Sequence, residues 1–392
     1  MKALINAKID PITQPEFEGS ILIKDGKIED KGEDLDIPED YEKIDLEGKR
    51  VIPGMIDAHC HVGIFEEGEG WEGDDTNELY DPITPHLRAL DGINPDGIAL
   101  KEAVSSGITS INVGPGSANP IGGKFTSMKT AGSKIVDDLI IKEPTGLKMA
   151  TGENPKRVYK DQKKMPSTRM STAGLIREKL FEASEYMKKL EEDTEEEIEK
   201  NFKLEAILPL LKDEIPGRIH AHRADDIASA VRISEEFGFE LIIEHCTEGH
   251  KIADFLAEKD IPVVFGPALS SRPKREMEEL SFRTPGILAE KGVKVAIMTD
   301  SPADPIKYLP LLAAYAVREG MEKREALKAI TINAAEICGI EDRVGSIEKG
   351  KDADLVVFDG DPLELKSRVE KVFIEGEEID LEEQAKGIPG QF

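Results

Sequence analysis

Cysteine is scarce in this chain, and its scarcity excludes several classes of protein. The 392 residues include three cysteines, Cys60, Cys246 and Cys338. Three are too few for a disulfide framework, and the sequence has no Cys-x-x-Cys pair of the kind that structural zinc sites use. Two of the three cysteines adjoin histidines, so the histidines around them need a chemical explanation.

Long apolar runs are missing as well. Apolar residues make up 39% of the chain, but no run reaches the ~18 residues that a membrane-spanning helix needs. The first ten residues, MKALINAKID, have neither the apolar stretch nor the small-residue cleavage site of a signal peptide. We therefore expect a cytoplasmic globular protein.

Positive charge is in the minority. Lys and Arg total 51 against 79 Asp and Glu, which gives a formal net charge of −28. Such an acidic surface repels phosphate backbones and anionic lipids, so we expect a small-molecule substrate and neither nucleic acid nor membrane as a partner. Acidic residues are concentrated at 191–200, which predicts a solvated helix face. The oligomeric state, including a homo-oligomer, is left open.

The two ends of the chain have a similar β pattern. Residues 20–28 predict a hairpin that turns at Asp25-Gly26, because an Asp-Gly pair favours a tight two-residue turn. Near the other end, residues 350–361 and 369–376 each contain a predicted strand. This symmetry indicates one small β domain that is built from both termini.

The middle of the chain alternates strands and helices, which is typical of a parallel α/β sheet; about eight such units close into a barrel. Helices are expected from Asp225 or Asp226 to Phe237, and at 175–190 and 322–338. The segments 139–142 and 147–150 lie too close together for a crossover helix, so one of them is not a barrel strand or a unit is degraded there. The predicted strands are 108–113, 147–150, 218–222, 240–245, 261–265 and 293–300.

Histidines are concentrated at the ends of the predicted strands. Side chains alternate along a strand, so His59 and His61 face one side and Cys60 faces the other, toward the helices. Five of the seven histidines end three apolar strands, and Asp300 ends another. Ligands collect at the carboxyl ends of barrel strands, so this placement predicts a divalent metal site. The five histidines are His59, His61, His220, His222 and His245.

These motifs resemble those of the amidohydrolase superfamily, in the branch of imidazolonepropionase-like enzymes and metal-dependent prolidases. The matching segments are PGMIDAHCH at 53–61, IEH at 243–245, Asp300 and GKDADLVVF at 350–358. The resemblance covers nearly the whole chain. It implies a (β/α)8 barrel at residues 53–343 and a composite β-sandwich from residues 1–52 and 344–392.

The resemblance also implies a set of metal ligands. His59 and His61 would bind the more buried ion together with Asp300. His220 and His245 would bind a second ion. His222 shares a face with His220, so the two could exchange roles; we favour His222 as a group that contacts the substrate.

Two-metal relatives also need a bridging carboxylate, which is often a carboxylated lysine on the fourth strand. Related prolidases place this lysine two positions before a Met-Ala-Thr-Gly-like stretch. Aligned on Met149, that position holds Leu147, and Lys148 falls one residue later with the opposite parity. We therefore favour Glu153 as the bridging ligand and keep Lys148 as the alternative.

The implied chemistry is hydrolysis of an amide-like C–N bond in a small molecule, cyclic amides and dipeptides included, with metal-activated water. Asp300 would be the base. The resemblance favours one or two Zn²⁺ ions, although His and carboxylate ligands also suit other metals. Arginines can bind a substrate carboxylate in bidentate fashion, and the candidates are Arg169, Arg223 and Arg272.

Two alternatives to the two-metal hydrolase stay open at this point. The first is a mononuclear imidazolonepropionase-like hydrolase or deaminase, in which Glu153 and either His220 or His245 serve the substrate. The second is a non-catalytic relative that keeps the fold for binding or assembly. The number of metal ions bound per chain would separate the first alternative from the two-metal hydrolase.

Overall fold

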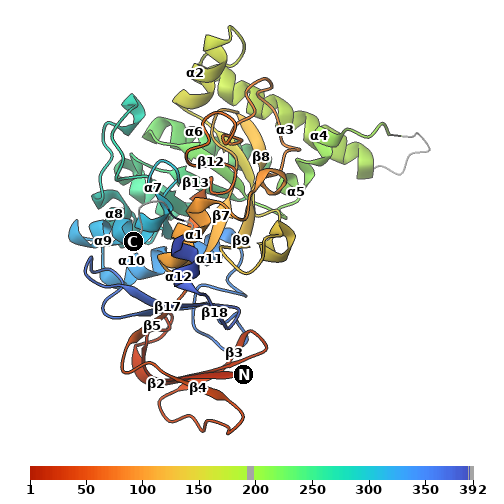
Figure 1. Cartoon of the computed structure of the whole chain (residues 1–392). Coiled ribbons are helices and arrows are strands. Elements are labelled where there is room, and N and C mark those ends of the chain that lie inside the picture. Colours follow the sequence, from red (N-terminus) through yellow and green to blue (C-terminus); the bar gives the residue numbers. More distant parts are fainter. Residues whose placement is uncertain (192–197, 387, 389–392) are drawn as a thin grey trace.

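The computed structural model of the chain describes residues 1–191, 198–386 and 388 (Figure 1). Residues 192–197, which form most of the acidic segment predicted as a solvated helix face, lie outside the described residues. The long helix before them ends at Glu191. Within the described residues, no helix is both long and apolar enough to cross a membrane.

The strands, in chain order, are β1 (Lys2–Ile9), β2 (Phe17–Lys24), β3 (Lys27–Gly32), β4 (Glu42–Asp45), β5 (Arg50–Pro53), β6 (Met55–Cys60), β7 (Ile108–Val113), β8 (Ile121–Lys124), β9 (Thr126–Lys129), β10 (Ile140–Lys142), β11 (Leu147–Ala150), β12 (Gly217–Ala221), β13 (Leu241–His245), β14 (Val263–Phe265), β15 (Val295–Ile297), β16 (Leu355–Phe358), β17 (Val369–Ile374) and β18 (Glu377–Glu378). The α-helices are α1 (Ile98–Ser105), α2 (Glu153–Asp161), α3 (Arg169–Glu191), α4 (Phe202–Glu205), α5 (Leu208–Leu211), α6 (Ala224–Phe237), α7 (Ala253–Glu258), α8 (Arg283–Glu290), α9 (Leu309–Arg318), α10 (Lys323–Ala329), α11 (Ile332–Cys338) and α12 (Leu381–Lys386).

Both ends of the chain contribute to one sheet, as the β pattern predicts. The order β18-β17-β16-β5-β1-β2-β3, with β4 beside β1, joins strands from the two termini. Asp25 and Gly26 have φ angles of 50° and 77°, as the predicted hairpin turn between β2 and β3 requires. The two ends meet where β5 pairs with β16 in antiparallel register. The buried core of this sheet includes Leu4 from one terminus and Phe373 from the other.

The terminal sheet is joined directly to the rest of the molecule. Only Gly54 separates β5 from β6, and its backbone N–H donates to the carbonyl of Asp354 at 2.9 Å. Lys129, in β9, donates to Asp352 at 2.9 Å and to Asp354 at 2.6 Å, and all three side chains are buried. The first strand that carries histidines therefore starts at the junction between the two parts of the fold.

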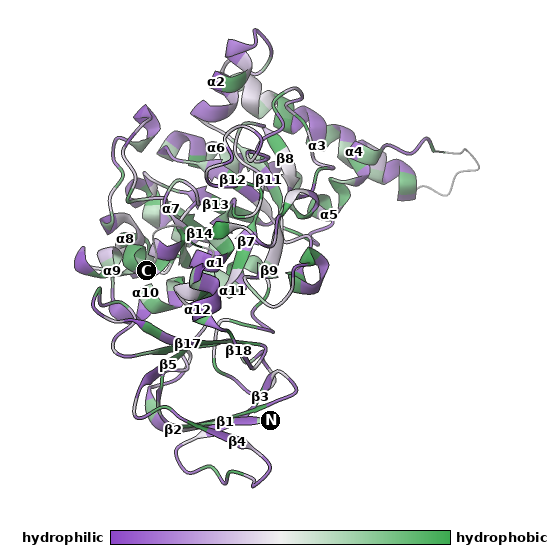
Figure 2. Ribbon diagram, in the orientation of Figure 1, coloured by the Kyte–Doolittle hydropathy of each residue, from purple (hydrophilic) through white to green (hydrophobic). Residues whose placement is uncertain are grey.

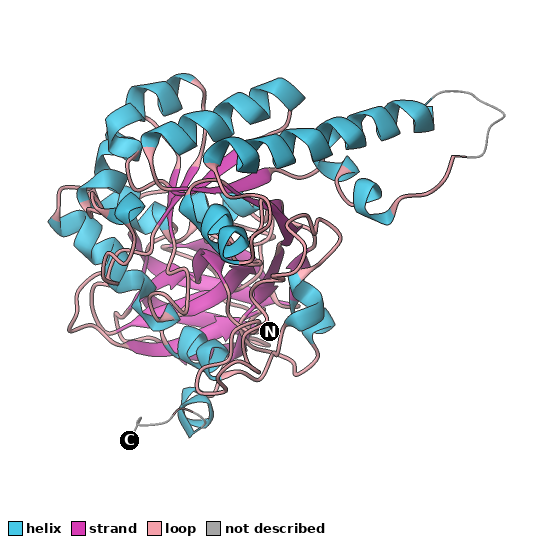
Figure 3. Cartoon of the chain, turned by 90° about the horizontal axis from the view of Figure 1, so that it is seen from above, coloured by secondary structure: helices cyan, strands magenta, loops and turns pink. Residues whose placement is uncertain are grey.

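Two further sheets form the centre of the α/β part, and helices cover them (Figures 1 and 3). One has the order β10-β9-β7-β6, and the other has the order β15-β14-β13-β12-β11-β8. The pairs from β11 to β15 are parallel, as are β6 and β7. Their carboxyl ends therefore share one edge in each sheet, which is the placement that the histidine pattern requires.

Strands β8, β9 and β10 form antiparallel pairs, an arrangement that the sequence did not predict. β9 pairs in antiparallel fashion with both β7 and β10, and β8 does so with β11. β10 is thus the segment outside the parallel set, whereas β11 belongs to it. The single helix predicted over 322–338 is also interrupted, because Thr331 leaves the helical conformation between α10 and α11.

Hydrophobic residues are concentrated in the inner strands, and hydrophilic residues dominate the outer helix faces (Figure 2). Helix α6 begins at Ala224 with Arg223 as its N-cap, so Asp225 and Asp226 lie in its first turn instead of capping it; Gly238 ends it in a left-handed conformation, as predicted. Cys60 is buried in the hydrophobic cluster that includes Leu100 of α1. Its side chain therefore packs toward the helices, as its parity indicates.

Candidate active site

The first group of polar side chains lies where β6 ends. His59, His61 and Asp300 offer ligand atoms that all lie within 4.8 Å of one another. The Nε2 atoms of His59 and His61 are 3.4 Å and 3.3 Å from Oδ1 of Asp300. Burial would raise the pKa of Asp300, but hydrogen bonds from the two imidazoles outweigh it and hold that pKa well below its usual range. Asp300 is therefore an anion in this site at neutral pH.

Asp57 fixes the backbone on both sides of this group. Its carboxylate accepts hydrogen bonds from the backbone N–H of His59 and from the backbone N–H of Thr299, each at 3.2 Å. The backbone N–H of Asp300 in turn donates to the carbonyl of His59 at 3.2 Å. Asp300 itself has a φ of 52°, a left-handed backbone that is costly for a residue with a side chain and is found at functional sites. These contacts hold β6 and the segment after β15 together.

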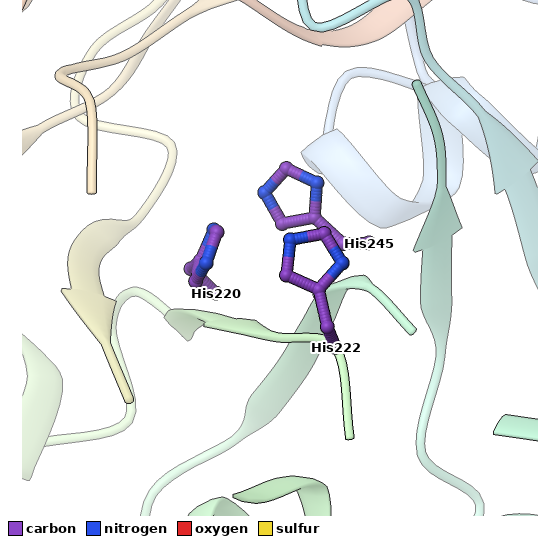
Figure 4. Close-up of side chains that lie close together, drawn as sticks. All are labelled: His220, His222 and His245. Carbon is purple, nitrogen blue, oxygen red and sulfur yellow. The ribbon is translucent and has the colours of Figure 1, made fainter. Parts of the chain in front are cut away.

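The second group contains only histidines. His220, His222 and His245 come from the ends of β12 and β13, and their ligand atoms also lie within 4.8 Å of one another. The rings cluster tightly, with centroids 4.3 Å apart for His220 and His245 (Figure 4). Burial lowers the pKa of His222 to about 4 and holds the pKa values of His220 and His245 well below their usual range, so all three imidazoles are neutral. Neutral imidazole is the form that binds metal.

A local break in strand alternation brings His245 into this group. Glu244 is in register with His220, so the two side chains point to the same, inner face of the sheet. Alternation would then turn His245 outward. His245 has a φ of 73°, however, and this left-handed backbone ends the alternation so that the ring joins the other two. Parity alone does not predict that both Glu244 and His245 face inward.

Hydrogen bonds orient three of the rings so that Nε2 faces the cavity. Nδ1 of His61 lies 2.7 Å from the carbonyl of Gly114, and Nδ1 of His245 lies 2.8 Å from that of Gly266. A carbonyl only accepts, so Nδ1 carries the proton in both rings; the Nε2 lone pair of His245 is then free, whereas Nε2 of His61 faces Asp300. Nδ1 of His222 is 2.8 Å from the hydroxyl of Thr247. Outer partners of this kind are typical of metal-binding histidines.

His220 supplies the strongest indication that the group binds something. Both of its ring nitrogens are buried and have no hydrogen-bond partner among the described residues. A buried nitrogen without a partner costs about 1–3 kcal/mol. A metal ion between the rings would remove that cost at one nitrogen, so the residues present fit a metal.

Lys148 lies beside the first group and lines the cavity that members of both groups line. It is 1% exposed, and its Nζ is 3.3 Å from Nε2 of His59. It also lines a cavity of about 470 Å³ together with His61, His220 and Asp300. Burial lowers the pKa of Lys148 to about 8, although the carboxylates of Glu244 and Asp300 oppose the change. The amine is therefore partly neutral, and hence nucleophilic, near neutral pH.

Glu244 was not among the predicted site residues, but it holds His59 in place. Its Oε2 lies 3.0 Å from Nδ1 of His59, and its Oε1 accepts from Nε of Arg218 at 2.6 Å. Arg218 also donates to the carbonyl of Ala58 at 2.7 Å. Burial opposes ionisation of Glu244, but Arg218 and His59 outweigh it and lower the pKa of its carboxyl. A charged residue within an apolar strand is the sequence signal that could have identified this pair.

Replacing Glu244 with glutamine should destabilise the protein by about 3–5 kcal/mol, because it leaves the charge of Arg218 buried without a counter-charge. The free energy of unfolding in urea would measure the change. Glu236→Gln, which breaks an exposed pair with Arg177, is the matched control and should cost far less. Equal losses in the two variants would contradict a buried, interdependent pair.

Glu153 belongs to neither of the two ligand groups. Glu153 is the first residue of α2 and lines a neighbouring cavity instead of the one that holds the histidines. The strand register bears on the choice between Glu153 and Lys148. Lys148 is in register with the inward-facing Arg218, whereas Met149 is in register with Ile219 and packs with it in the outer hydrophobic layer.

Glu276 is a buried carboxylate that the sequence did not single out. Its Oε1 has no hydrogen-bond partner among the described residues and lies 3.8 Å from Nε2 of His220 and 3.9 Å from Nε2 of His222. Its Oε2 accepts from the backbone N–H of Glu153 at 2.9 Å. It lies in a short 3-10 helix, Arg275–Met277, that has no apolar pattern, and no spacing rule indicates it.

The three candidate arginines are already occupied by protein groups. Arg223 makes a bidentate pair with Asp225 at 2.8 and 2.9 Å, and Nε of Arg169 binds Asp226 at 2.9 Å. Arg272 donates to the carbonyl of Leu280 at 2.7 Å. None of the three lines the cavity that holds the histidines.

Comparison with known proteins identifies the family. A family model described as the amidohydrolase family matches residues 50–379. The chain belongs to the amidohydrolase family. It is an enzyme of the kind that acts on C–N bonds, and its two side-chain clusters are typical candidates for the metal sites of amidohydrolases.

Two curated relatives match this amidohydrolase over most of its length. Amidohydrolase tasK of Hapsidospora irregularis is 28% identical over 91% of this chain, which spans 39% of the tasK protein. Imidazolonepropionase of Fusobacterium nucleatum subsp. nucleatum is 26% identical over 90% of this chain and 87% of its own length. The relatives support the predicted imidazolonepropionase-like branch.

Solved structures show the same fold as this amidohydrolase. An amidohydrolase from Thermotoga maritima MSB8 superposes with a TM-score of 0.94 at 49% identity, covering 97% of this chain and all of that one. A prolidase complexed with N-methylphosphonate-L-proline has a TM-score of 0.62 at 20% identity and covers 97% of this chain and 99% of its own. The prolidase likeness is evidence for the fold alone.

Proposed function

We propose that this amidohydrolase is a metal-dependent hydrolase that cleaves an amide-like C–N bond of a small molecule, with dipeptides and cyclic amides as the substrate classes. The observation that carries the proposal is the convergence of two ligand groups on one cavity, which the buried Lys148 also lines. Isolated buried histidines would need neither the second group nor the amine.

The ligand sets follow from the two groups. His59, His61 and Asp300 would hold one divalent ion, and His220 and His245 would hold the second. His222 shares the second group and would be either a third ligand or a contact for the substrate carbonyl. Zn²⁺ is the proposed ion because four-coordinate sites rich in imidazole suit it.

Lys148 would supply the bridging carboxylate, in place of Glu153. Its neutral amine adds to the carbon of carbon dioxide; an N–C bond forms and one proton is released, which gives a carbamate. The pKa of about 8 leaves about one amine in ten neutral at pH 7, and metal binding would then hold the carbamate in place. The placement of Lys148 supports this role.

A bound divalent ion would supply a water whose pKa is lowered from 15.7 to about 7. Asp300 would orient this water and accept its proton through its carboxylate, then deliver the proton to the leaving nitrogen. Glu244 and Arg218 would keep the ring of His59 in its working orientation. The cavity of about 470 Å³ is in the range that accommodates a small ligand.

We also propose that the two central sheets form one (β/α)8-type barrel within residues 53–343, with residues 1–52 and 344–392 as the composite β-sandwich. Two junctions support the barrel. The hydrogen bond from Asp300 to His59 joins the ends of β15 and β6, and Phe125 alone separates β8 from β9. The antiparallel β8 and β9 would then occupy the third strand position.

Metal analysis and a substrate screen test the proposed function. Purified protein should contain two divalent ions per chain and should hydrolyse at least one member of a panel of N-acyl amino acids, dipeptides and cyclic ureas. Removing the metal with a chelator should abolish turnover and lower the melting temperature, and adding Zn²⁺ back should restore both.

One bound ion per chain would favour the mononuclear hydrolase or deaminase instead. A protein that bound no metal, and whose melting temperature did not change on chelation, would overturn the proposal.

A further inference from the structure

A second cavity, of about 380 Å³, lies beside the one that holds the histidines. We call it the basic pocket, because six cationic side chains and three carboxylates line it. Glu153, Lys156, Arg157 and Lys160 of α2 are four of these residues. They are spaced i, i+3, i+4 and i+7, so a single face of α2 is turned toward the pocket. Figure 1 shows α2 at the outer end of the α/β part, near α3 and α6.

The cations of the basic pocket fall into two sets. Arg169, Arg223 and Arg275 are paired with Asp226, Asp225 and Glu278. Lys156, Arg157 and Lys160 have no carboxylate within 4.0 Å in the part of the chain that the structure describes. Many other surface lysines in that part are paired, several of them with a glutamate three residues away. The three cations of α2 are thus left available.

The basic pocket and the histidine cavity share a wall. One segment lines both cavities. Lys274 and Met277 line the histidine cavity, and Arg275 and Glu276, which lie between them in the chain, line the basic pocket. The carboxylate of Glu276 separates the two, with Oε1 only 3.8 Å from Nε2 of His220. At the other side, Glu153 lines the basic pocket and its neighbour Asn154 lines the histidine cavity. The two cavities therefore lie side by side.

The negative net charge of the chain makes the basic pocket stand out as a place where anions are attracted. A net charge of −28 repels anions from most of the surface. Unpaired cations beside the active site reverse that field locally and raise the concentration of anions at one place. Lysine and arginine side chains that converge on a cavity also form the charge-assisted hydrogen bonds that carboxylate and phosphate oxygens accept.

We infer that the basic pocket binds an anionic group of the substrate, a carboxylate or a phosphate, that lies away from the scissile C–N bond. Lys156, Arg157 and Lys160 hold this group, and the amide faces the two histidine groups. The inference rests on the proposed function for the bond that is cleaved. It adds the substrate class, namely small amides with an acidic substituent, such as dipeptides or N-acyl amino acids with an acidic side chain.

Matched pairs of substrates test the inference. The ratio of kcat/KM between N-acetyl-glutamate and N-acetyl-glutamine, and between Glu- and Gln-containing dipeptides, isolates one negative charge. Phosphoserine and serine versions of the same compounds distinguish phosphate from carboxylate. The wild-type enzyme should prefer the acidic member by about tenfold or more, as expected for one or two charge-assisted hydrogen bonds.

Two double variants remove the same charge from different places. Lys156→Gln/Arg157→Gln should lower the acidic-to-neutral ratio by about tenfold. Lys163→Gln/Lys164→Gln, which changes exposed residues that line neither cavity, should leave the ratio unchanged. A wild-type ratio of one or below, or an equal fall in both variants, would overturn the inference.

A binding measurement separates this inference from the proposed function. Glutarate and inorganic phosphate should raise the melting temperature of the metal-loaded wild type by more than that of Lys156→Gln/Arg157→Gln. If no amide is hydrolysed but this difference is seen, the proposed function fails and the anion site stands. Equal shifts in the wild type and the double variant would refute the anion site, whatever the enzyme cleaves.

Discussion

Asp300→Asn should reduce kcat by about 10²–10⁴-fold, the range that a positioned general base contributes, while leaving metal bound. Asparagine keeps the shape and one oxygen of the side chain but cannot accept a proton from water. It also tolerates the left-handed backbone at this position, where φ is 52°. The variant therefore removes the base without the conformational penalty that alanine or glutamate would add.

Steady-state kinetics and metal analysis on the same preparation would measure this effect. Asp260→Asn changes an exposed carboxylate that also has a left-handed backbone (φ 51°) and lines neither the histidine cavity nor the basic pocket, and it should keep wild-type activity. Wild-type turnover in Asp300→Asn would refute the role of Asp300 as the base. Loss of activity together with loss of metal would assign Asp300 to metal binding alone.

Lys148→Ala should lower kcat/KM by about 10³-fold, because losing a bridging ligand removes several kcal/mol of transition-state stabilisation. It should also reduce the metal content to about one ion per chain. Burial leaves an empty space where the side chain was, so acetate or propionate added to the assay should enter it and restore part of the activity.

Rescue by a carboxylate separates a carbamate from a plain buried amine, since only a missing carboxylate can be replaced in this way. Native mass spectrometry of the wild type should show the added mass of one carbon dioxide, and Lys148→Ala should lack it. Lys142→Ala, at the exposed edge strand β10, is the control and should behave as wild type. Unchanged activity and metal content in Lys148→Ala would eliminate the bridging role.

The sequence predicts the positions of His59 and His61 well, because they depend on strand parity and parity is a local property. The sequence predicts equally well that the two termini join in one sheet, since each end has its own alternating pattern. The antiparallel β8 to β10 were not predicted, because strand direction is set by pairing partners that local composition does not reveal. The break at Thr331 within an apparently continuous helical pattern was missed for a similar reason.

The preference for Glu153 over Lys148 shows where reasoning from a resemblance is weakest. The comparison was anchored on Met149, and a shift of one residue moves a side chain to the other face of a strand. Only the register with β12 reveals that Lys148 points inward. Glu244 had a signal, a charge within an apolar strand, but Glu276 acts through contacts with segments far apart in the chain, and spacing could not assign it.

The pairing of β5 with β16 has a consequence for synthesis of the chain. The strand that carries His59 follows β5 after one residue. The strand that pairs with one edge of β5, β16, lies about 300 residues later in the chain (Val51 with Val357). At about 5–20 residues per second, ribosomes need roughly 15–60 seconds to make that stretch. During this interval β5 lacks the partner that covers its edge, and such unpaired edges are prone to aggregation. Co-expressed chaperones should therefore raise the yield of metal-competent enzyme.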